Sequence, residues 1–138
     1  MEKLFVDSDI IMDLLAERES FLEHALKLFS LANDKKVKLY STAVIFANVF
    51  YLLRKINGWQ KAKQQLKDLR ELVSVLPVSE KAVDLSLNSI FSDFEDGLQY
   101  FTAKENKFSV LITRNIKDYK ISGMKVMTAQ TYFEKEQK

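Results

Sequence analysis

Cysteine is absent from this 138-residue sequence, and histidine and proline occur once each. Without cysteine the chain can form no disulfide, zinc finger, iron–sulfur cluster or thiol nucleophile. A single histidine, His24, excludes a two-histidine zinc site and is the one base available to a Ser-His-Asp triad. The three glycines lie too far apart to form a P-loop or a G-x-G-x-x-G motif. Any chemistry must therefore be carried by carboxylates.

Long apolar runs and a strong net charge are also missing. The longest apolar run, Ala43–Leu53, is interrupted by Asn48 and is far shorter than the roughly 20 residues that span a bilayer. The first residues reach Asp7 before a signal-peptide apolar region could form. A formal net charge of +2 is too small to indicate nucleic-acid binding from bulk electrostatics. We therefore expect a cytoplasmic protein without a membrane segment, folded as a single domain over residues 1–138.

Strand-like and helix-like segments alternate along the chain. The strand-like runs are Lys3–Val6, Lys38–Tyr40, Val73–Leu76, Val110–Ile112 and Lys125–Met127. The helical patterns cover 21–32, 43–56, 59–71, 80–91, 94–106 and 129–133, with Thr42, Ser79, Asp93 and Thr128 as candidate N-caps. This alternation predicts an α/β fold with a mostly parallel sheet. Such sheets bind ligands at the carboxyl ends of their strands, near the topological switch point.

Acidic residues occur directly after two of the predicted strands and at the start of one predicted helix. They are Asp7 and Asp9 after the first strand, Asp93, Glu95 and Asp96 at a helix start, and Asp118 after the fourth strand. Each group also has an ordinary structural explanation, as a helix cap or a polar loop. If they meet at one edge of the sheet, their repulsion raises their pKa values unless a cation lies between them. Mg²⁺ or Mn²⁺ would suit these oxygen ligands, as in phosphoryl-transfer sites.

The segments that carry these acids resemble the motifs of PIN domains. Phe5–Leu15, FVDSDIIMDLL, resembles their hydrophobic-D-T-N-hydrophobic opening. Asp93–Tyr100, DFEDGLQY, resembles their central D-x-E-D-A-L-Q segment, and Leu111–Tyr119, LITRNIKDY, resembles their closing I-V-T-R-N-x-x-D-F segment. Each motif is weak alone, but the three occur in the family's order across almost the whole chain.

The resemblance implies a three-layer α/β/α fold with a five-stranded parallel sheet in the order 3-2-1-4-5. It also implies an endoribonuclease that depends on Mg²⁺ or Mn²⁺. Among small single-domain bacterial members it implies the toxin of a VapBC-type toxin–antitoxin pair, with RNA and an antitoxin protein as partners. The catalytic metal ligands would be Asp7, Asp96 and Asp118. Polar supports would be Thr113 and Asn115, and Asp9 stands where the family usually has Asn.

The sequence departs from the family pattern at the second acid, where Asn48 stands in place of the usual Glu. An unpaired buried amide costs roughly 1–3 kcal/mol, so Asn48 must bind a backbone group, its equivalent across a dimer, or the metal site. The missing charge should weaken metal binding unless Asp9 or Glu95 restores it. This leaves a catalytically weakened or inactive PIN-like module that binds RNA or protein as the alternative. An aspartyl phosphatase of the haloacid-dehalogenase type, with its D-x-D opening at Asp7, is a further one.

Basic and aromatic residues offer candidate interaction surfaces. The candidates for binding an RNA backbone are Lys61 and Lys63 near the turn at Gly58, and Arg114, Lys117 and Lys120 near the acids. A solvated helix face explains the first group equally well. The aromatic residues Phe46, Phe50, Tyr51 and Trp59 are expected in the core, with a homodimer or antitoxin groove as the alternative. His24 is expected at the surface or its boundary.

Overall fold

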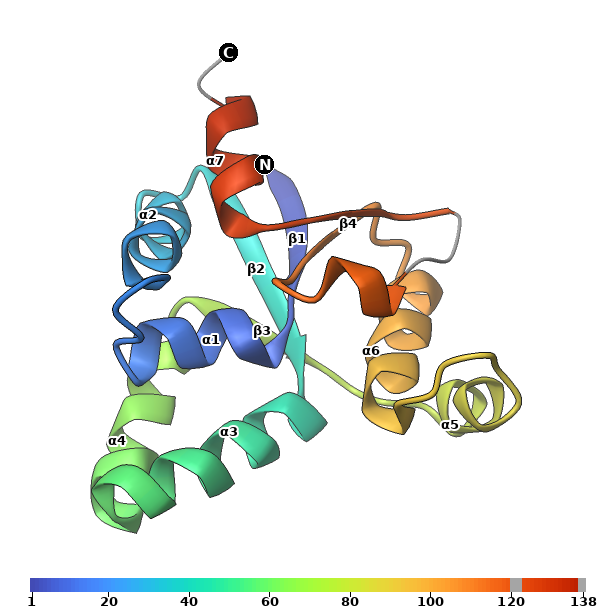
Figure 1. The fold of residues 1–138 in the computed structure, drawn as a ribbon, viewed down its shortest axis with the longest axis horizontal. Helices are drawn as coiled ribbons and strands as arrows, with labels where there is room; N and C mark the ends of the chain where they lie inside the picture. Colours follow the sequence, from blue (N-terminus) through green and yellow to red (C-terminus); the bar gives the residue numbers. More distant parts are fainter. Residues whose placement is uncertain (120–122, 137–138) are drawn as a thin grey trace.

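The five strands form one parallel sheet in the order β3-β2-β1-β4-β5, which confirms the predicted fold. The computed structural model describes residues 1–119 and 123–136. Its elements, shown in Figure 1, are β1 (Glu2–Val6), α1 (Ser8–Leu15), α2 (Leu22–Asn33), β2 (Val37–Thr42), α3 (Ala43–Asn57), α4 (Trp59–Arg70), β3 (Val73–Leu76), α5 (Glu80–Leu87), α6 (Phe94–Glu105), β4 (Val110–Ile112), the 3-10 helix η1 (Ile116–Tyr119), β5 (Lys125–Met127) and α7 (Ala129–Glu136).

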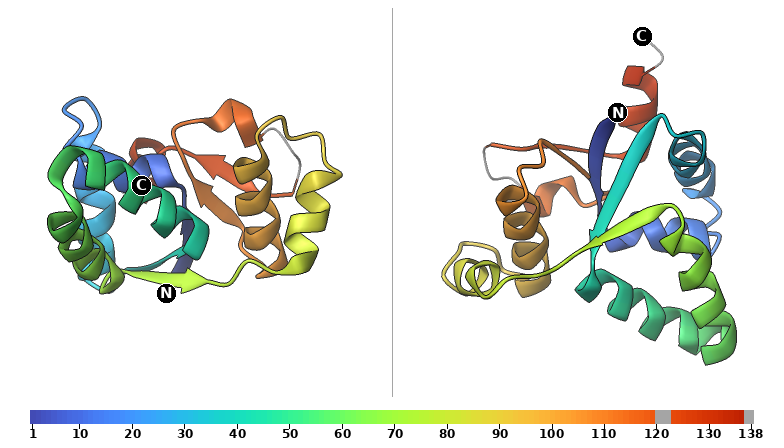
Figure 2. Two further views of the ribbon diagram at one scale, coloured as in Figure 1. Left: turned by 90° about the horizontal axis from the view of Figure 1, so that it is seen from below. Right: turned by 180° about the vertical axis from the view of Figure 1, so that it is seen from behind.

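Helices cover both faces of the sheet. Figure 2 shows α1 to α4 on one side and α5 with α6 on the other, while α7 packs against α2. The chain crosses from β1 to β2 in one direction and from β3 back to β4 on the far side of β1. β1 and β4 are therefore parallel neighbours at the switch point, with Val6 opposite Ile112. Ligands of such sheets bind at this position, just beyond the carboxyl ends of the strands.

The central strands are buried on both faces, so they are continuous apolar runs rather than alternating patterns. Leu4, Phe5 and Val6 of β1 have no exposed surface, and β4 is buried throughout. The predicted strands agree with the structure to within two residues at either end. The helix predicted to reach Phe91 instead ends at Leu87, because side chains there compete for helix carbonyls. Ser89 Oγ, for example, donates to the carbonyl of Ser86 at 2.8 Å.

Four helices begin at the predicted N-caps. Thr42 Oγ1 accepts from the N–H of Ile45, Ser79 Oγ from that of Ala82, Asp93 Oδ1 from that of Asp96, and Thr128 Oγ1 from that of Thr131, all at 3.0 or 3.1 Å. Gly58 ends α3 with a φ of 85°, a conformation that favours glycine. These local signals fix where α3 and α6 start, and both starts lie at the carboxyl edge of the sheet.

Gly97 lets α5 and α6 approach closely. A Cβ at this position would lie 2.1 Å from Ser86 Oγ, which itself donates to the carbonyl of Phe94 at 2.9 Å. The resembling PIN motif has alanine here, so this chain has exchanged a methyl group for a serine hydroxyl across the helix pair. The glycine thereby helps to hold the first turn of α6 in place.

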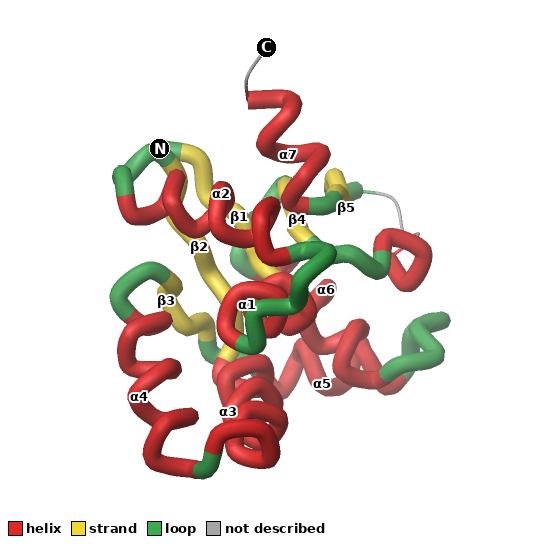
Figure 3. Tube along the Cα trace, turned by 60° about the vertical axis from the view of Figure 1, so that its left-hand side comes forward, coloured by secondary structure: helices red, strands yellow, loops and turns green. Residues whose placement is uncertain are grey.

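The aromatic residues of α3 and α4 divide into two groups. Phe46 and Phe50 are half-buried and pack against the core, as predicted. The core prediction was wrong for Tyr51 and Trp59, which are 50% and 52% exposed. The buried stripe of α3 is Ile45, Val49 and Leu53, so Tyr51 lies off that stripe. Figure 3 shows α3 and α4 as an outer helix pair beside the sheet.

His24 is half-buried on α2, at the boundary where it was expected. Over residues 1–119 and 123–136, no helix is long and apolar enough to span a membrane.

Candidate active site

Asp7 lies at the switch point because β1 ends at Val6 and its own N–H donates to the carbonyl of Ile112 at 3.0 Å. It is the N-cap of α1, and its Oδ1 accepts from the N–H of Ser8 at 2.8 Å. Its Oδ2 accepts from Thr113 Oγ1 and from the Tyr119 hydroxyl, both at 3.0 Å. Burial, together with the charge of Asp9, raises the pKa of Asp7 to about 6 despite these donors. The capping explanation is therefore correct, but Asp7 is also a buried carboxylate at the sheet edge whose charged form is disfavoured.

Tyr119 joins Asp7 to the second acidic segment. Its buried hydroxyl lies 3.0 Å from Asp7 Oδ2 and 3.3 Å from Asp96 Oδ1. Burial and the two carboxylates raise the pKa of Tyr119, so the hydroxyl keeps its proton and donates. One proton thus serves two acceptors. Sequence reasoning gave this residue no role, although the resembling motif has Phe here and the extra hydroxyl was a visible departure.

Asp96 lies in the first turn of α6 and is half-buried. Burial and the charges of Asp93, Asp7 and Asp118 raise its pKa to about 7, while Tyr119 opposes that shift. The helix is anchored one turn further on, where Thr42 Oγ1 donates to the buried Gln99 Oε1 at 2.9 Å. A carboxyl with this pKa carries a proton for part of the time at neutral pH, so it binds any nearby cation in competition with that proton.

The three predicted ligands come together, since Asp7 and Asp118 both act on the charge of Asp96. Asp118 is exposed on η1 and lies at the rim of the site. Within the described ranges, however, no three acidic or histidine side chains are already arranged to hold a metal ion. Two of the acids, Asp7 and Asp96, instead contact the Tyr119 hydroxyl.

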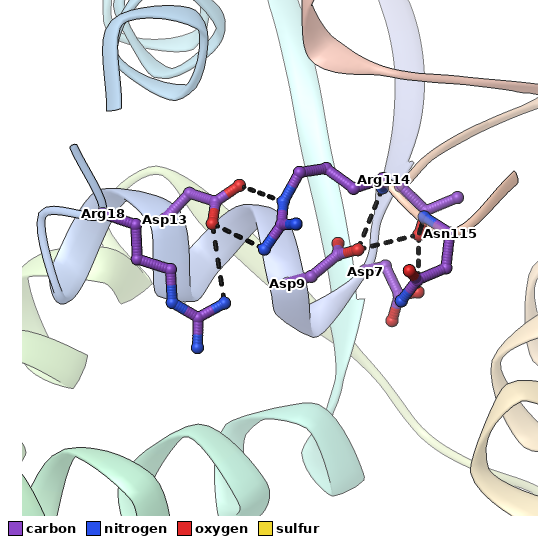
Figure 4. Close-up of polar contacts among 7 residues, drawn as sticks. Asp7, Asp9, Asp13, Arg18, Arg114 and Asn115 are labelled. Atoms are coloured by element: carbon purple, nitrogen blue, oxygen red, sulfur yellow. Dashed lines mark hydrogen bonds and ion pairs between the residues drawn. The ribbon is translucent and has the colours of Figure 1, made fainter. Parts of the chain in front are cut away.

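Asp9 is held by the loop that follows β4. Its Oδ2 accepts from Thr113 Oγ1 at 3.2 Å and from the Arg114 N–H at 2.9 Å (Figure 4). Its Oδ1 is buried and has no hydrogen-bond partner in the described part of the chain. Burial raises the pKa of Asp9. Thr113 Oγ1 also accepts from the N–H of Asn115 at 3.1 Å, so this hydroxyl supports both Asp7 and Asp9, while the Asn115 side chain is exposed.

The Arg114 side chain extends along α1 to Asp13, as Figure 4 shows. Its Nε and Nη2 donate to the carboxylate of Asp13 at 2.8 and 3.0 Å, and its guanidinium lies 3.9 Å from the centre of the Phe21 ring. Arg18 Nη1 is a second, longer partner of Asp13 at 3.6 Å. The structure thus gives Arg114 a bidentate ion pair with Asp13, and its contact with RNA stays a prediction.

Asn48 is half-buried on α3, and its amide donates to Glu95 Oε1 on α6. Its partner is therefore neither a backbone group nor a copy of itself. Burial and Asp93 raise the pKa of Glu95, and the bond from Asn48 opposes this. At the position of the missing acid, α3 presents an amide that binds a carboxylate of the neighbouring helix.

The lysines named as RNA-binding candidates lie on two separate elements. Lys117 is exposed on η1, next to Asp118. Lys61 and Lys63 are exposed on α4, which lies at the opposite end of α3 from α6 (Figure 1), and Lys63 Nζ lies over the Trp59 ring at 5.5 Å. These two lysines are therefore remote from the acids. Lys120 lies outside the described residues.

Comparison with known proteins gives consistent results. A family model for the PIN domain matches residues 3–117. Ribonuclease VapC1 of Aquifex aeolicus is 28% identical over 142 residues, covering 97% of this chain and 95% of the relative. The DNA-bound VapBC structure from Salmonella typhimurium matches with a TM-score of 0.72 at 14% identity, covering 94% of this chain and 99% of that one. Mycobacterium tuberculosis VapC20, described as a sarcin–ricin loop cleaving toxin, matches with a TM-score of 0.67 at 12% identity, over 88% and 98% of the two chains.

Proposed function

Because this chain belongs to the PIN-domain family, we propose that it is a divalent-metal-dependent endoribonuclease and the toxin of a toxin–antitoxin pair. The observation that carries the proposal is that buried Asp7 and half-buried Asp96 meet at the switch point on one hydroxyl, that of Tyr119, with Asp118 at the rim. The relative from Aquifex aeolicus is named a ribonuclease, and the structure from Mycobacterium tuberculosis is described as a sarcin–ricin loop cleaving toxin. Neither comparison favours the phosphatase alternative.

The residues present fit a hard divalent cation. All the candidate ligands are oxygen atoms, which Mg²⁺ and Mn²⁺ prefer. Burial holds the carboxyl groups of Asp7 and Asp96 at raised pKa values, so their charged forms are unfavourable without a cation. The unpartnered Oδ1 of Asp9 is a further buried acceptor. We infer that Asp7, Asp96 and Asp118 hold the ion, which would neutralise charge on a phosphodiester and lower the pKa of a bound water.

The surrounding residues orient these acids. Thr113 and Tyr119 fix the Asp7 carboxylate, and the main chain of Arg114 fixes Asp9. Lys117 and the side chain of Asn115 are exposed beside the acids, so we assign them to contact with the RNA backbone. Given their place on α4, Lys61 and Lys63 would contact only an RNA that extends along the whole α3–α4 pair.

Two exposed apolar groups support protein partners. One consists of Tyr51, Leu52, Ile56 and Trp59 on α3 and α4, and the other of Leu85, Leu87, Ile90 and Phe94 on and between α5 and α6. Contiguous exposed apolar patches mark interaction sites in soluble proteins. We infer a homodimer and an antitoxin protein in the cytoplasm, tested by light scattering and by co-purification with the product of a small neighbouring gene.

Incubation of the purified protein with mixed RNA tests the activity. We expect cleavage with Mg²⁺ or Mn²⁺, none with EDTA, and none for Asp7→Asn or Asp96→Asn. Asp34→Asn, an exposed change at the end of α2, is the matched control and should cleave normally. Tight, salt-sensitive RNA binding without cleavage at high Mn²⁺ would show a binding module instead. A phosphoaspartate trapped at Asp7 would show a phosphatase.

A further inference from the structure

The Tyr119 hydroxyl contacts two of the three carboxylates proposed to bind the cation. The contacts are to Asp7 Oδ2 and Asp96 Oδ1, the two least exposed carboxylates among the three proposed ligands. The resembling motif ends in Phe at this position, so the hydroxyl is a feature of this chain and not of the pattern. Among the described residues no metal site is preassembled, which agrees with a hydroxyl lying between the acids.

The hydroxyl stabilises the negative charge of the two carboxylates, as a bound cation would do more strongly. It directs the positive end of an O–H dipole at two carboxylates that repel each other. Hydrogen bonds to charged acceptors are stronger than those between neutral groups. A cation that approaches these two oxygen atoms from the side of the hydroxyl competes with both bonds.

The ring cannot easily move the hydroxyl aside. Tyr119 is 2% exposed, and its ring packs edge-on against Phe91 with centroids 5.9 Å apart. Side chains in close-packed interiors shift only at a cost to their neighbours. The hydroxyl is thus fixed beside the acids by the core of the protein.

We propose that the Tyr119 hydroxyl competes with the divalent cation for Asp7 and Asp96 and so weakens the affinity of the site for metal. The proposal rests on the metal site of the proposed function. It assigns Tyr119 as a positioning residue, which stabilises the metal-free acids and tunes how much cation is needed to load them.

Calorimetric titration of the full chain with Mn²⁺ alone, at pH 8, tests the proposal. For Tyr119→Phe, which installs the residue of the motif, we expect the apparent Kd to fall about tenfold, equivalent to about 1.4 kcal/mol. Tyr132→Phe is the matched control. It removes another buried tyrosine hydroxyl that donates to a carboxylate, Glu2 Oε1 at 2.6 Å, but at the opposite end of β1. Its Kd should equal that of the wild type.

Thermal unfolding separates competition from a merely structural role. With EDTA, both variants should unfold at lower temperature than the wild type. With saturating Mn²⁺, the deficit of Tyr119→Phe should close and that of Tyr132→Phe should remain. An unchanged or larger Kd for Tyr119→Phe would overturn the proposal, while metal-dependent cleavage by the wild type would leave the proposed function standing. If neither the wild type nor Tyr119→Phe binds Mn²⁺, both ideas fail together.

Discussion

Replacing Arg114 by alanine should destabilise the protein and not merely weaken RNA binding. The side chain of Asp13 is 2% exposed, and Arg114, 27% exposed, is its bidentate partner. Removing one partner of a buried ion pair costs roughly 3–5 kcal/mol, because the other charge stays buried. Arg18 remains at 3.6 Å and solvent screens part of the loss. We therefore expect Arg114→Ala to lower the free energy of unfolding by about 2–3 kcal/mol.

Urea denaturation measures this change, and two further variants identify its cause. Lys117→Ala removes the same charge from the same loop, but its side chain is exposed, so it should change stability by less than about 0.5 kcal/mol. Adding Asp13→Asn to Arg114→Ala removes the uncompensated buried charge and should recover much of the stability. RNA affinity should show the reverse order, with Lys117→Ala the more damaging change.

The same variant has a functional consequence through the main chain. The N–H of Arg114 holds Asp9, and Thr113, its neighbour, holds both Asp7 and Asp9. Loss of the ion pair frees this loop, so cleavage should fall even where most molecules remain folded. The reasoning is refuted if Arg114→Ala unfolds at the wild-type urea midpoint and loses only RNA affinity, because Arg114 would then face the substrate.

Three other changes follow from the site and its supports. The pKa of Asp7 rises from 3.8 to about 6 on folding. In EDTA, the protonated carboxyl should therefore contribute roughly 2–3 kcal/mol to the free energy of unfolding below pH 4, and this contribution should be lost as the pH rises through 6. Urea denaturation at a series of pH values measures this dependence, which Asp7→Asn should flatten. Glu95→Gln should weaken Mn²⁺ binding in calorimetry, and adding Asn48→Glu, which returns the acid to α3, should restore it; equal affinities would place this pair outside the metal site. Gly97→Ala should lower the thermal midpoint by several degrees through its clash with Ser86, and Ser86→Ala should relieve most of that loss; no loss would mean that the helices part freely.

The sheet could be predicted from the sequence because its strands are buried on both faces. A strand of this kind is a short apolar run between polar segments, and Val110–Ile112 and Lys125–Met127 were found with the bounds that the structure has. Helix starts were equally visible, since caps such as Thr42 and Asp93 act within their own first turn. No local sequence pattern indicates the order of the strands in the sheet, so the order was predicted from the family resemblance alone.

The site was predicted less completely because its side chains find partners far along the chain. Arg114 and Asp13 are 101 residues apart, and Tyr119 and Asp7 are 112 apart. Nothing local to Arg114 shows that it turns back along α1, so its neighbourhood of basic residues suggested an RNA contact. Lys61 and Lys63 were named as RNA-binding candidates from their charge, and the length of α3 separates them from the acids. Tyr51 and Trp59 likewise lie in apolar stretches of the sequence, but their side chains are not on the buried faces of their helices.

If Asp7 and Asp96 hold the cation as proposed, the same contacts that stabilise the metal-free site would also weaken its binding of metal. Asn48 supplies an amide where a fourth carboxylate would add repulsion, and Tyr119 supplies a hydroxyl to two of the carboxylates that remain. Both changes lower the energy of the metal-free acids, and both subtract from what a cation gains by binding them. The two effects act on different atoms, so removing the hydroxyl and returning the acid to α3 should increase Mn²⁺ affinity independently. A variant that combines Tyr119→Phe with Asn48→Glu should then bind Mn²⁺ more tightly than either single variant and be the least stable of the three in EDTA.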